Sequence, residues 1–267
     1  MNLTTFLIYA PAMQLNGKRV LVIGGGGGGI GRATTEAVGN EGAAVLVADL
    51  DPARAEEAAQ AVRTRGGTAY PISGDVRSAA DIEAMVAGAV DKLGGLDVLV
   101  TVVGGQVAFV PAVKLHEMAD EDWDTIYEVN LRYVARAVRA ALRVFLDQGT
   151  GGAIVSVGSV TGFMAAPAQA AYGVMKAGIL SLARTVAAEY ARDGIRMNVA
   201  AAGAIATAVA NANVAAEVVE EIPAGRFGRS EEVAAAVAYL ASDVSSYMTG
   251  QQVVLDGGVS VRGPFDE

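Results

Sequence analysis

Short hydrophobic runs alternate with longer segments of mixed polar and apolar residues along most of the chain. The runs are rich in valine, isoleucine and alanine, which is typical of strands buried on both faces of a parallel sheet. The longer segments between them have compositions that favour helices. This alternation predicts an α/β fold, a Rossmann-type doubly wound parallel sheet of about seven strands with helices on both faces.

The predicted strands lie at 18–23, 43–49, 68–73, 97–103 and 152–157, and the predicted helices at 30–43, 51–66, 79–94, 120–146 and 170–190. No linker or long repeat interrupts the alternation. We therefore expect residues 15–267 to form a single domain. The apolar amino-terminal stretch 1–14 lacks a basic segment and is short for a signal peptide, so we interpret it as a loose arm or a partner contact.

A run of six glycines, residues 24–29, follows the first predicted strand and precedes Ile30 and Gly31 at the start of a helix. Glycine backbone N–H groups can approach a pyrophosphate closely, and the amino end of a helix attracts the same charge. A glycine run alone is also typical of a flexible linker. The strand before it and the helix after it favour a dinucleotide-binding loop.

Asp49 ends the second predicted strand, eighteen residues after Gly31. A Rossmann unit places an acidic residue here against the adenosine ribose. A carboxylate accepts hydrogen bonds from the two hydroxyls of NAD and repels the 2′-phosphate of NADP, and neither Gly28 nor Leu50 offers a basic side chain in compensation. The sequence therefore predicts NAD. Capping of the next helix is better assigned to Asp51.

Tyr172 and Lys176 lie four residues apart in the predicted helix 170–190, so their side chains emerge from one face. A free tyrosine has a pKa of about 10, and we expect the nearby ammonium to lower it. Ser159 closely follows the predicted strand 152–157, at an edge where open α/β sheets usually bind ligands. Taken alone, the tyrosine and lysine are more typical of a core aromatic beside a solvated lysine, and the rest of the chain favours a site.

Other candidate residues follow strands or interrupt a helix. Asp75 and Val76 come just after the third predicted strand, on the side expected for adenine, and Gly104 follows the fourth. Asn130 interrupts the otherwise apolar pattern of the helix 120–146. Such an asparagine is usually a kink or a packed polar group, but beside Tyr172 it could hold a water molecule.

Composition narrows the functional classes. A net charge of −9 disfavours nucleic-acid or anionic membrane partners, and the chain has no cysteine and only one histidine, His116. We therefore expect no metal site and interpret His116 as a surface residue near a helix start. No apolar run is long enough to span a membrane, which favours a cytoplasmic protein.

The chain resembles the short-chain dehydrogenase/reductase family from about Leu15 to Gly258. Its glycine loop is similar to the family's T-G-x-x-x-G-I-G, the segments 196–207 and 225–258 resemble R-x-N-x-x-x-P-G-x-I-x-T and the family's closing stretch, and four residues match its catalytic tetrad. The matching residues are Gly25, Gly29, Ile30 and Gly31 in the loop, Asn130, Ser159, Tyr172 and Lys176 in the tetrad, and Ile205 and Thr207 near the nicotinamide.

The resemblance implies hydride transfer between NAD(H) and a secondary alcohol or ketone. It implies that Tyr172 is the general acid/base, that Ser159 binds the substrate oxygen, and that Lys176 also holds the nicotinamide ribose. Asn130 would carry a water linking Lys176 to solvent. Glycines, Asp49, Leu50, Asp75 and Val76 would complete the cofactor site, and the family implies a homotetramer.

Three segments depart from the family pattern. Gly24 replaces a threonine, 101–104 reads T-V-V-G in place of N-N-A-G, and Ala202 replaces the proline before Gly203. Two of these segments brace the floor of the cofactor pocket in the family, so their joint change indicates a differently packed floor. The third loosens the loop over the nicotinamide. We expect weaker or slower cofactor binding than is usual for the family.

The substrate is the least determined feature. The segment 204–221, rich in small apolar residues, corresponds to the family's variable substrate-covering region and suggests a hydroxysteroid or terpene-like alcohol. Its alanines are equally consistent with simple helix packing. One alternative is a 3-oxoacyl thioester reductase, which Asp49 and the negative charge disfavour. Another is a non-catalytic dinucleotide-binding sensor or assembly subunit, which the complete tetrad disfavours.

Overall fold

A computed structural model describes residues 15–207 and 219–262. Its main sheet has seven strands in the order β3-β2-β1-β4-β5-β6-β9, and every neighbouring pair is parallel. The predicted doubly wound α/β fold is therefore confirmed. The strands are β1 (Arg19–Ile23), β2 (Ala44–Asp49), β3 (Thr68–Ser73), β4 (Val98–Thr101), β5 (Gly152–Ser159), β6 (Ile195–Ala202) and β9 (Gln252–Leu255).

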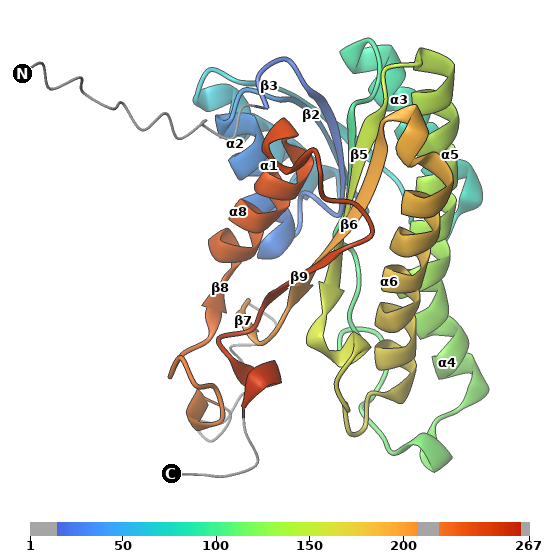
Figure 1. Cartoon of the computed structure of the whole chain (residues 1–267), viewed down its shortest axis with the longest axis vertical. Helices are drawn as coiled ribbons and strands as arrows, with labels where there is room; N and C mark the ends of the chain where they lie inside the picture. Colours follow the sequence, from blue (N-terminus) through green and yellow to red (C-terminus); the bar gives the residue numbers. More distant parts are fainter. Residues whose placement is uncertain (1–14, 208–218, 263–267) are drawn as a thin grey trace, which may run out of the picture.

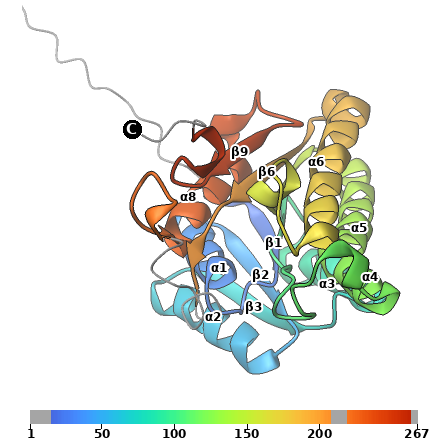
Figure 2. The same cartoon turned by 90° about the horizontal axis from the view of Figure 1, so that it is seen from below.

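Helices cover both faces of the sheet (Figures 1 and 2). One face carries α1 (Ile30–Asn40), α2 (Pro52–Thr64) and α8 (Ser230–Ala241), and the other carries α3 (Ala79–Leu93), α4 (Asp120–Tyr127), α5 (Tyr133–Gln148) and α6 (Ala170–Tyr190). Two separate hydrophobic clusters fill the spaces between the sheet and these layers. Both faces are buried, which explains the nearly continuous hydrophobic strands.

The structure corrects the predicted helix 120–146. It divides at a π-helical turn, Glu128–Arg132, which contains Asn130 and separates α4 from α5. The predicted strand 97–103 is also shorter, since β4 ends at Thr101. A short pair of strands, β7 (Ile205–Ala206) and β8 (Gly228–Arg229), was not predicted.

Several local predictions are confirmed. Strand β3 and helix α6 have the predicted bounds. The Asp51 carboxylate caps α2 by accepting the N–H of Ala53. His116 is exposed in a turn that precedes α4. The predicted arm 1–14 lies outside the described residues, and no helix in the described part of the chain has the length and hydropathy to cross a bilayer.

The strand order reverses between β1 and β4, and such a switch point is where open α/β sheets bind ligands. Ile23 and Thr101, the last residues of these two strands, pair with each other in the sheet. The glycine loop follows Ile23, and the segment Val102 to Gly104 follows Thr101. Two of the three departures noted in the sequence therefore lie side by side at this point.

Candidate active site

Ser159, Tyr172 and Lys176 come together at the side of the sheet where the parallel strands end, which we call its carboxyl edge. Ser159 is the last residue of β5, and the other two lie in the first two turns of α6. The Ser159 hydroxyl is near enough to the Tyr172 phenol to favour its ionised form. The ammonium of Lys176 lies 5.4 Å from the centre of the Tyr172 ring and donates to the carbonyl oxygen of Val157 at 2.9 Å. The predicted grouping of these three side chains is present.

The electrostatics of this cluster correct one expectation. Burial raises the pKa of Tyr172, and the nearby Ser159 hydroxyl only partly opposes it. Burial also lowers the pKa of Lys176 to about 8. We expected Lys176 to bring the pKa of Tyr172 down, but loss of hydration for a buried phenolate outweighs the neighbouring groups. The protein alone keeps this tyrosine neutral at physiological pH.

Thr161, which belongs to no motif of the sequence, orients Ser159. The Ser159 Oγ accepts the Thr161 N–H at 3.2 Å and the Thr161 hydroxyl at 2.9 Å. A serine hydroxyl has two acceptor positions and one donor. Because Thr161 occupies both acceptor positions, the remaining proton of Ser159 is directed to another acceptor, and Tyr172 is the neighbour that can take it. A donated hydrogen bond favours the phenolate.

Asn130 is fully buried and joins the π-helical turn to the loop after β4. Its Oδ1 accepts the N–H of Gly105, and its Nδ2 donates to the carbonyl oxygens of Gly105 and Ile126, all at 2.9 to 3.0 Å. In a regular α-helix the carbonyl of Ile126 would accept the N–H of residue 130. The π-turn leaves this carbonyl to the side chain, so Asn130 acts as a clamp on the loop.

Gly104 lies between Asn130 and Lys176. A Cβ atom at this position would come within 2.6 Å of Asn130 Oδ1 and 3.0 Å of Lys176 Nζ, and the backbone has a φ of 157°. Only glycine lets the chain pass so close to both side chains. The structure thus brings the four predicted tetrad residues and Gly104 to one place.

The glycine loop forms a backbone cradle at the amino end of α1. A Cβ at Gly31 would lie 1.9 Å from the carbonyl oxygen of Gly24, and Gly25 is held by the hydroxyl of Thr35. Gly29 has a φ of 127° and is the residue before the helix. The outer side of the loop at Gly28 has no atom within 4 Å of an added Cβ. Exposed N–H groups at a helix start fit a pyrophosphate.

Asp49 lies beside this cradle. Its two carboxylate oxygens accept the N–H groups of Gly26 and Asp51, each at 3.1 Å. Asp49 also lines a cavity of 430 Å³ that runs between the glycine loop and the loops after β3 and β4. The predicted cofactor residues Leu50, Asp75 and Val76 line the same cavity, as do Arg54, Arg77, Val103 and Phe109. Its size and lining fit the adenosine portion of a dinucleotide.

Two arginines in this cavity were missed. Arg54, five residues after Asp49, is the basic side chain nearest in sequence to the predicted ribose carboxylate. Arg77 binds the Asp75 carboxylate through its side chain and its backbone N–H, which lowers the pKa of Asp75. Neither belongs to a motif with fixed spacing, and only the fold brings them to the cavity.

Gly24 and Val103, two positions at which the chain departs from the family pattern, are in direct contact. A Cβ at Gly24 would lie 2.7 Å from Val103 Cγ2, and Gly24 has a φ of 86°. The larger valine, which replaces the family's alanine, therefore occupies the space that a side chain at position 24 would need. The prediction that the two changes are linked agrees with this packing.

Ile205 and Thr207 have different surroundings. The Ile205 side chain lies against β8, where its Cδ1 would meet a Cβ at Gly228 at 2.6 Å. Thr207 lies over the glycine loop, with Cγ2 3.1 Å from a Cβ at Gly29. Residues 208–218, most of the predicted substrate-covering segment, lie outside the described residues.

Comparison with known proteins gives similarities over nearly the whole chain. The family described as Enoyl-(Acyl carrier protein) reductase matches residues 25–260. (5R,7aS)-5-hydroxy-7a-methyl-1-oxo-2,3,5,6,7,7a-hexahydro-1H-indene-carboxyl-CoA reductase from Mycobacterium tuberculosis is 38% identical over 246 residues, covering 90% of this chain and 92% of that protein. A 3-oxoacyl-(acyl-carrier-protein) reductase from Thermotoga maritima is 35% identical over 252 residues, covering 93% and 100%.

A solved structure extends the comparison to three dimensions. The chain superposes on 7 alpha-hydroxysteroid dehydrogenase complexed with NADH and 7-oxo glycochenodeoxycholic acid with a TM-score of 0.86 at 26% sequence identity. The match covers 92% of this chain and 96% of that one.

Proposed function

Because this chain belongs to the short-chain dehydrogenase/reductase family, and is therefore an oxidoreductase that uses a nicotinamide dinucleotide, we propose that it transfers a hydride between NAD(H) and a secondary alcohol or its ketone. The observation that carries this proposal is the convergence of Ser159, Tyr172, Lys176 and Asn130 beside Gly104. The cofactor supplies the hydride chemistry, and the chain supplies binding, orientation and proton transfer.

In this mechanism Tyr172 exchanges a proton with the substrate oxygen, donating it during ketone reduction and accepting it during alcohol oxidation. Its raised pKa makes the neutral, proton-donating form the resting form. With substrate bound, Ser159 donates its single proton to the substrate oxygen instead of to Tyr172 and stabilises the charge that develops there. Lys176, held by Val157, keeps a positive charge beside the phenol and binds the nicotinamide ribose. Asn130 fixes the loop at Gly105, and its proposed role of carrying a water toward Lys176 stays a prediction.

NAD is the proposed cofactor because Asp49 places a carboxylate at the cavity that would hold the adenosine ribose. The two N–H groups it accepts fix the carboxylate in place, and its negative charge opposes a 2′-phosphate. Arg54 is the competing feature, since its guanidinium lines the same cavity. Its exposed side chain lies 3.5 Å from Asp51, so part of its charge is already engaged.

We propose an apolar cyclic alcohol, such as a hydroxysteroid or a terpene-like alcohol, as the substrate. Phe163, four residues after Ser159, is an exposed aromatic side chain close in sequence to the tetrad. The names of a relative and a structural neighbour, an indene-carboxyl-CoA reductase and a hydroxysteroid dehydrogenase, also describe fused-ring substrates. A 3-oxoacyl thioester is the second candidate, supported by the Thermotoga maritima relative.

The experiment that tests the proposal is incubation of the protein with NAD⁺ and a panel of alcohols, with NADH formation followed by absorbance. The panel contains a 7α-hydroxysteroid, borneol and cyclohexanol, and the reverse reaction is tried with NADH or NADPH and a 3-oxoacyl thioester. We expect turnover with the cyclic alcohols. Binding of NADH without turnover on any of these compounds would instead indicate a dinucleotide-binding protein that lacks this activity.

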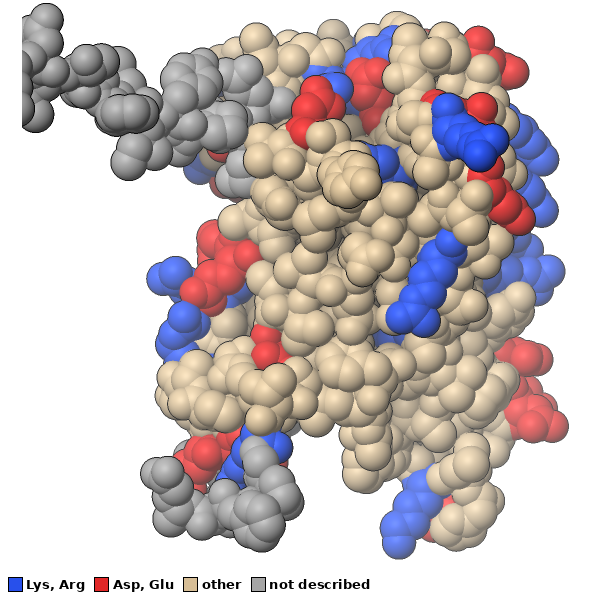
Figure 3. All heavy atoms as spheres, viewed as in Figure 1, with Lys and Arg blue, Asp and Glu red and all other residues tan. Residues whose placement is uncertain are grey.

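We also propose a cytoplasmic homotetramer. Exposed apolar side chains occur near the carboxyl end, at Val244, Tyr247 and Val254, and on α6 at Val174. Figure 3 shows a broad area with few charged side chains across the face formed by α8, β9 and α6. Light scattering should give four times the chain mass of 27.1 kDa, and a monomeric mass would contradict this assembly.

A further inference from the structure

We propose that Gln106 is a positioning residue for Tyr172: its side-chain amide holds the strained turn from which α6 begins. The proposal rests on the assigned role of Tyr172 and concerns a residue outside the tetrad. Gln106 lies in the loop after β4, with 3% of its surface exposed. It directly follows Gly105, the residue clamped by Asn130.

Gln106 connects two loops that are far apart in the sequence. Its Nε2 donates to the carbonyl oxygen of Ala168 at 2.9 Å and to that of Pro111 at 3.3 Å. Its own backbone carbonyl accepts the N–H groups of Phe109 and Val110 at 2.8 and 2.9 Å. One residue therefore organises the loop after β4 and ties it to the segment just before α6.

Ala168 lies in a backbone conformation that alanine disfavours. Its φ is 62°, and it is the one non-glycine residue with positive φ in the described ranges 15–207 and 219–262. The N–H of Gln169 donates to the carbonyl of Ala166 at 3.0 Å, which closes a four-residue turn with Pro167 and Ala168 in its centre. This is the pattern of a type II turn, whose third position favours glycine. A residue other than glycine is strained there because its Cβ approaches the following carbonyl oxygen.

The strained turn determines where Tyr172 lies. Helix α6 begins at Ala170, so Tyr172 is in its first turn and four residues after Ala168. A relaxed turn would change the direction in which the chain enters the helix and would move the phenol relative to Ser159, which is fixed at the end of β5. The hydrogen bond from Gln106 to Ala168 opposes that relaxation.

Gln106 also retains an unfavourable feature. Its Oε1 is one of two buried side-chain polar atoms without a hydrogen-bond partner in the part of the chain that the structure describes. An unsatisfied buried acceptor destabilises the fold because it loses its hydration without gaining a partner. An apolar side chain would avoid this cost but would leave the carbonyls of Pro111 and Ala168 without their donor. The contribution of Gln106 is therefore the geometry that its two donors impose.

The test replaces the amide and measures Tyr172 directly. Gln106→Met keeps the side-chain length and removes both donors. Tyrosinate absorbance is titrated in each protein with and without Tyr172→Phe, and the difference gives the midpoint of Tyr172. We expect Gln106→Met to raise this midpoint by about one pH unit, because the phenol moves away from the Ser159 hydroxyl, and to slow turnover by about 10- to 100-fold. The NADH dissociation constant should stay within about twofold of the wild-type value.

Two further variants distinguish positioning from stability. Ala168→Gly removes the strain of the turn, so in the Gln106→Met background it should restore the midpoint and most of the turnover. Gln106→Glu keeps the shape but donates a hydrogen bond only when protonated, so its turnover relative to the wild type at the same pH should recover as the pH is lowered. The control is Gln60→Met, the same substitution at an exposed glutamine of α2; it should change neither quantity.

A change in melting temperature alone, with the Tyr172 midpoint and turnover unchanged in Gln106→Met, would overturn the proposal, as would failure of Ala168→Gly to restore them. If Gln106→Met does not fold, the Tyr172 midpoint and the turnover of Gln106→Glu decide between the same two outcomes. The absorbance titration needs no substrate. If the protein turns over none of the tested alcohols, the proposed function is contradicted. The titration of Tyr172 still decides whether Gln106 positions this residue. Emission of Trp123, the only tryptophan, checks that the cluster packed around Tyr172 stays intact.

Discussion

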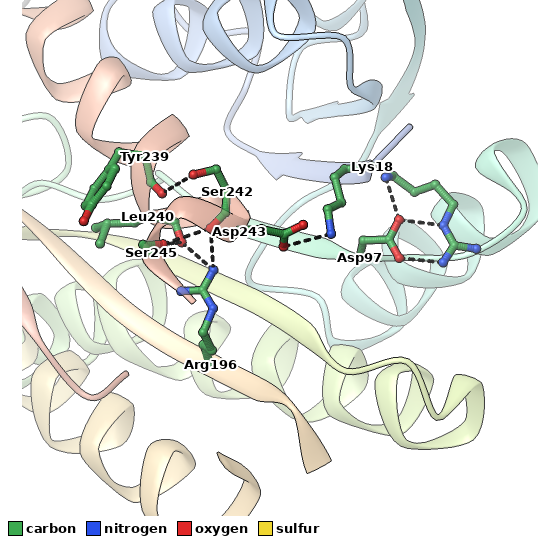
Figure 4. A network of polar contacts seen from close by, with 9 residues as sticks. Lys18, Asp97, Arg196, Tyr239, Leu240, Ser242, Asp243 and Ser245 are labelled. Carbon is green, nitrogen blue, oxygen red and sulfur yellow. Dashed lines mark hydrogen bonds and ion pairs between the residues drawn. The ribbon is translucent and has the colours of Figure 1, made fainter. Parts of the chain in front are cut away.

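The two ends of the parallel strands carry polar networks of different kinds. We call the side where the strands begin the amino edge and the side where they end the carboxyl edge. At the amino edge, the Arg19 guanidinium binds both carboxylate oxygens of Asp97, and Lys18 pairs with Asp243 (Figure 4). Arg196 donates there to the carbonyl oxygens of Leu240 and Ser242 at the carboxyl end of α8, and to that of Met248. These donors face acceptors, and the cations lie where the helix dipole favours them.

At the carboxyl edge the groups are buried but less completely compensated. Lys176 is 96% buried and its pKa falls to about 8, the pKa of Tyr172 rises, and Gln106 has an unpartnered oxygen. Polar groups that pair fully stabilise the fold, whereas groups whose protonation is perturbed are typical of catalytic sites. The amino edge should therefore respond to substitution in stability, and the carboxyl edge in turnover.

The largest expected difference is between two buried tyrosines. Tyr172→Phe should reduce turnover by about 10²–10⁴-fold, because it removes the proton donor, while NADH binding and folding persist. The matched control is Tyr133→Phe, which removes a phenol that donates to the carbonyl oxygen of Val103 and has no role in proton transfer. It should cost about 0.5–1.5 kcal/mol of unfolding free energy. Steady-state rates and urea denaturation measure the two effects, and equal turnover in both variants would remove the distinction.

Asp49, at the carboxyl edge, should affect cofactor choice. Asp49→Asn removes the negative charge that opposes a 2′-phosphate, and its single amide oxygen can still accept one of the two N–H groups, of Gly26 or of Asp51, that the carboxylate accepts. We expect the preference for NADH over NADPH to fall by about tenfold, equal to about 1.4 kcal/mol. The dissociation constants of both cofactors, measured by nicotinamide fluorescence, give this ratio. A wild-type protein that binds NADPH more tightly would contradict the assignment and point to Arg54.

Asp97, at the amino edge, should affect stability. Burial favours its protonated form, but hydrogen bonds from Arg19 outweigh this and hold the pKa of Asp97 below its usual value. Asp97→Asn should lower the free energy of unfolding by about 1–3 kcal/mol at pH 7 and leave turnover within about twofold. The carboxylate contributes stability above its unfolded pKa of about 3.9 and loses it as the pH falls toward the lower folded value.

Urea denaturation at pH 7 and pH 3 checks the sign for Asp97, since the difference between wild type and Asp97→Asn should shrink at the lower pH. Asp243→Asn is the control. Its side chain is 77% exposed beside Lys18, so its loss should be within about 1 kcal/mol. A larger loss for Asp243 than for Asp97 would contradict the assignment of the fully paired site.

The smallest expected effect concerns Gly24 and Val103. Gly24→Ala should destabilise the fold because an added Cβ meets Val103 Cγ2 and the φ is positive. In a Val103→Ala background part of this cost should disappear, with a coupling of about 0.5–1 kcal/mol in a double-mutant cycle. Additive effects would show that the two departures are independent. The same departures predict weaker cofactor binding than is usual for the family. Calorimetry of NAD binding tests this, and an affinity as tight as is ordinary for the family would contradict it.

The sequence predicted most of the fold because hydrophobic runs and alanine-rich segments are local signals. Strand β3 and helix α6 have the predicted bounds, and strands and helices alternate from β1 to α6 as expected. The division of 120–146 at a π-turn was predicted only as an interruption at Asn130. Its form depends on Gly105, a partner 25 residues away, which no local pattern reveals.

The candidate site was predictable where motif spacing fixes it, as for Ser159, Tyr172 and Lys176. Thr161, Arg54 and Gln106 were missed because their importance depends on contacts that arise only in the fold. The direction of the Tyr172 pKa was also wrong. The spacing of the two residues predicted that the charge of Lys176 lies near the phenol. It could not predict the burial of the phenol, which has the larger effect on the pKa of Tyr172.

The central claim is that Tyr172 is the proton-transfer group of a perturbed site at the carboxyl edge. The pH dependence of alcohol oxidation tests it most directly, because oxidation requires the phenolate. With the best alcohol of the panel and saturating NAD⁺, we predict that kcat in the wild type rises as the pH is raised from neutrality into the alkaline range, and that Tyr172→Phe lacks this rise. A wild-type kcat that is independent of pH over this range, or the same rise in Tyr172→Phe, would contradict the claim.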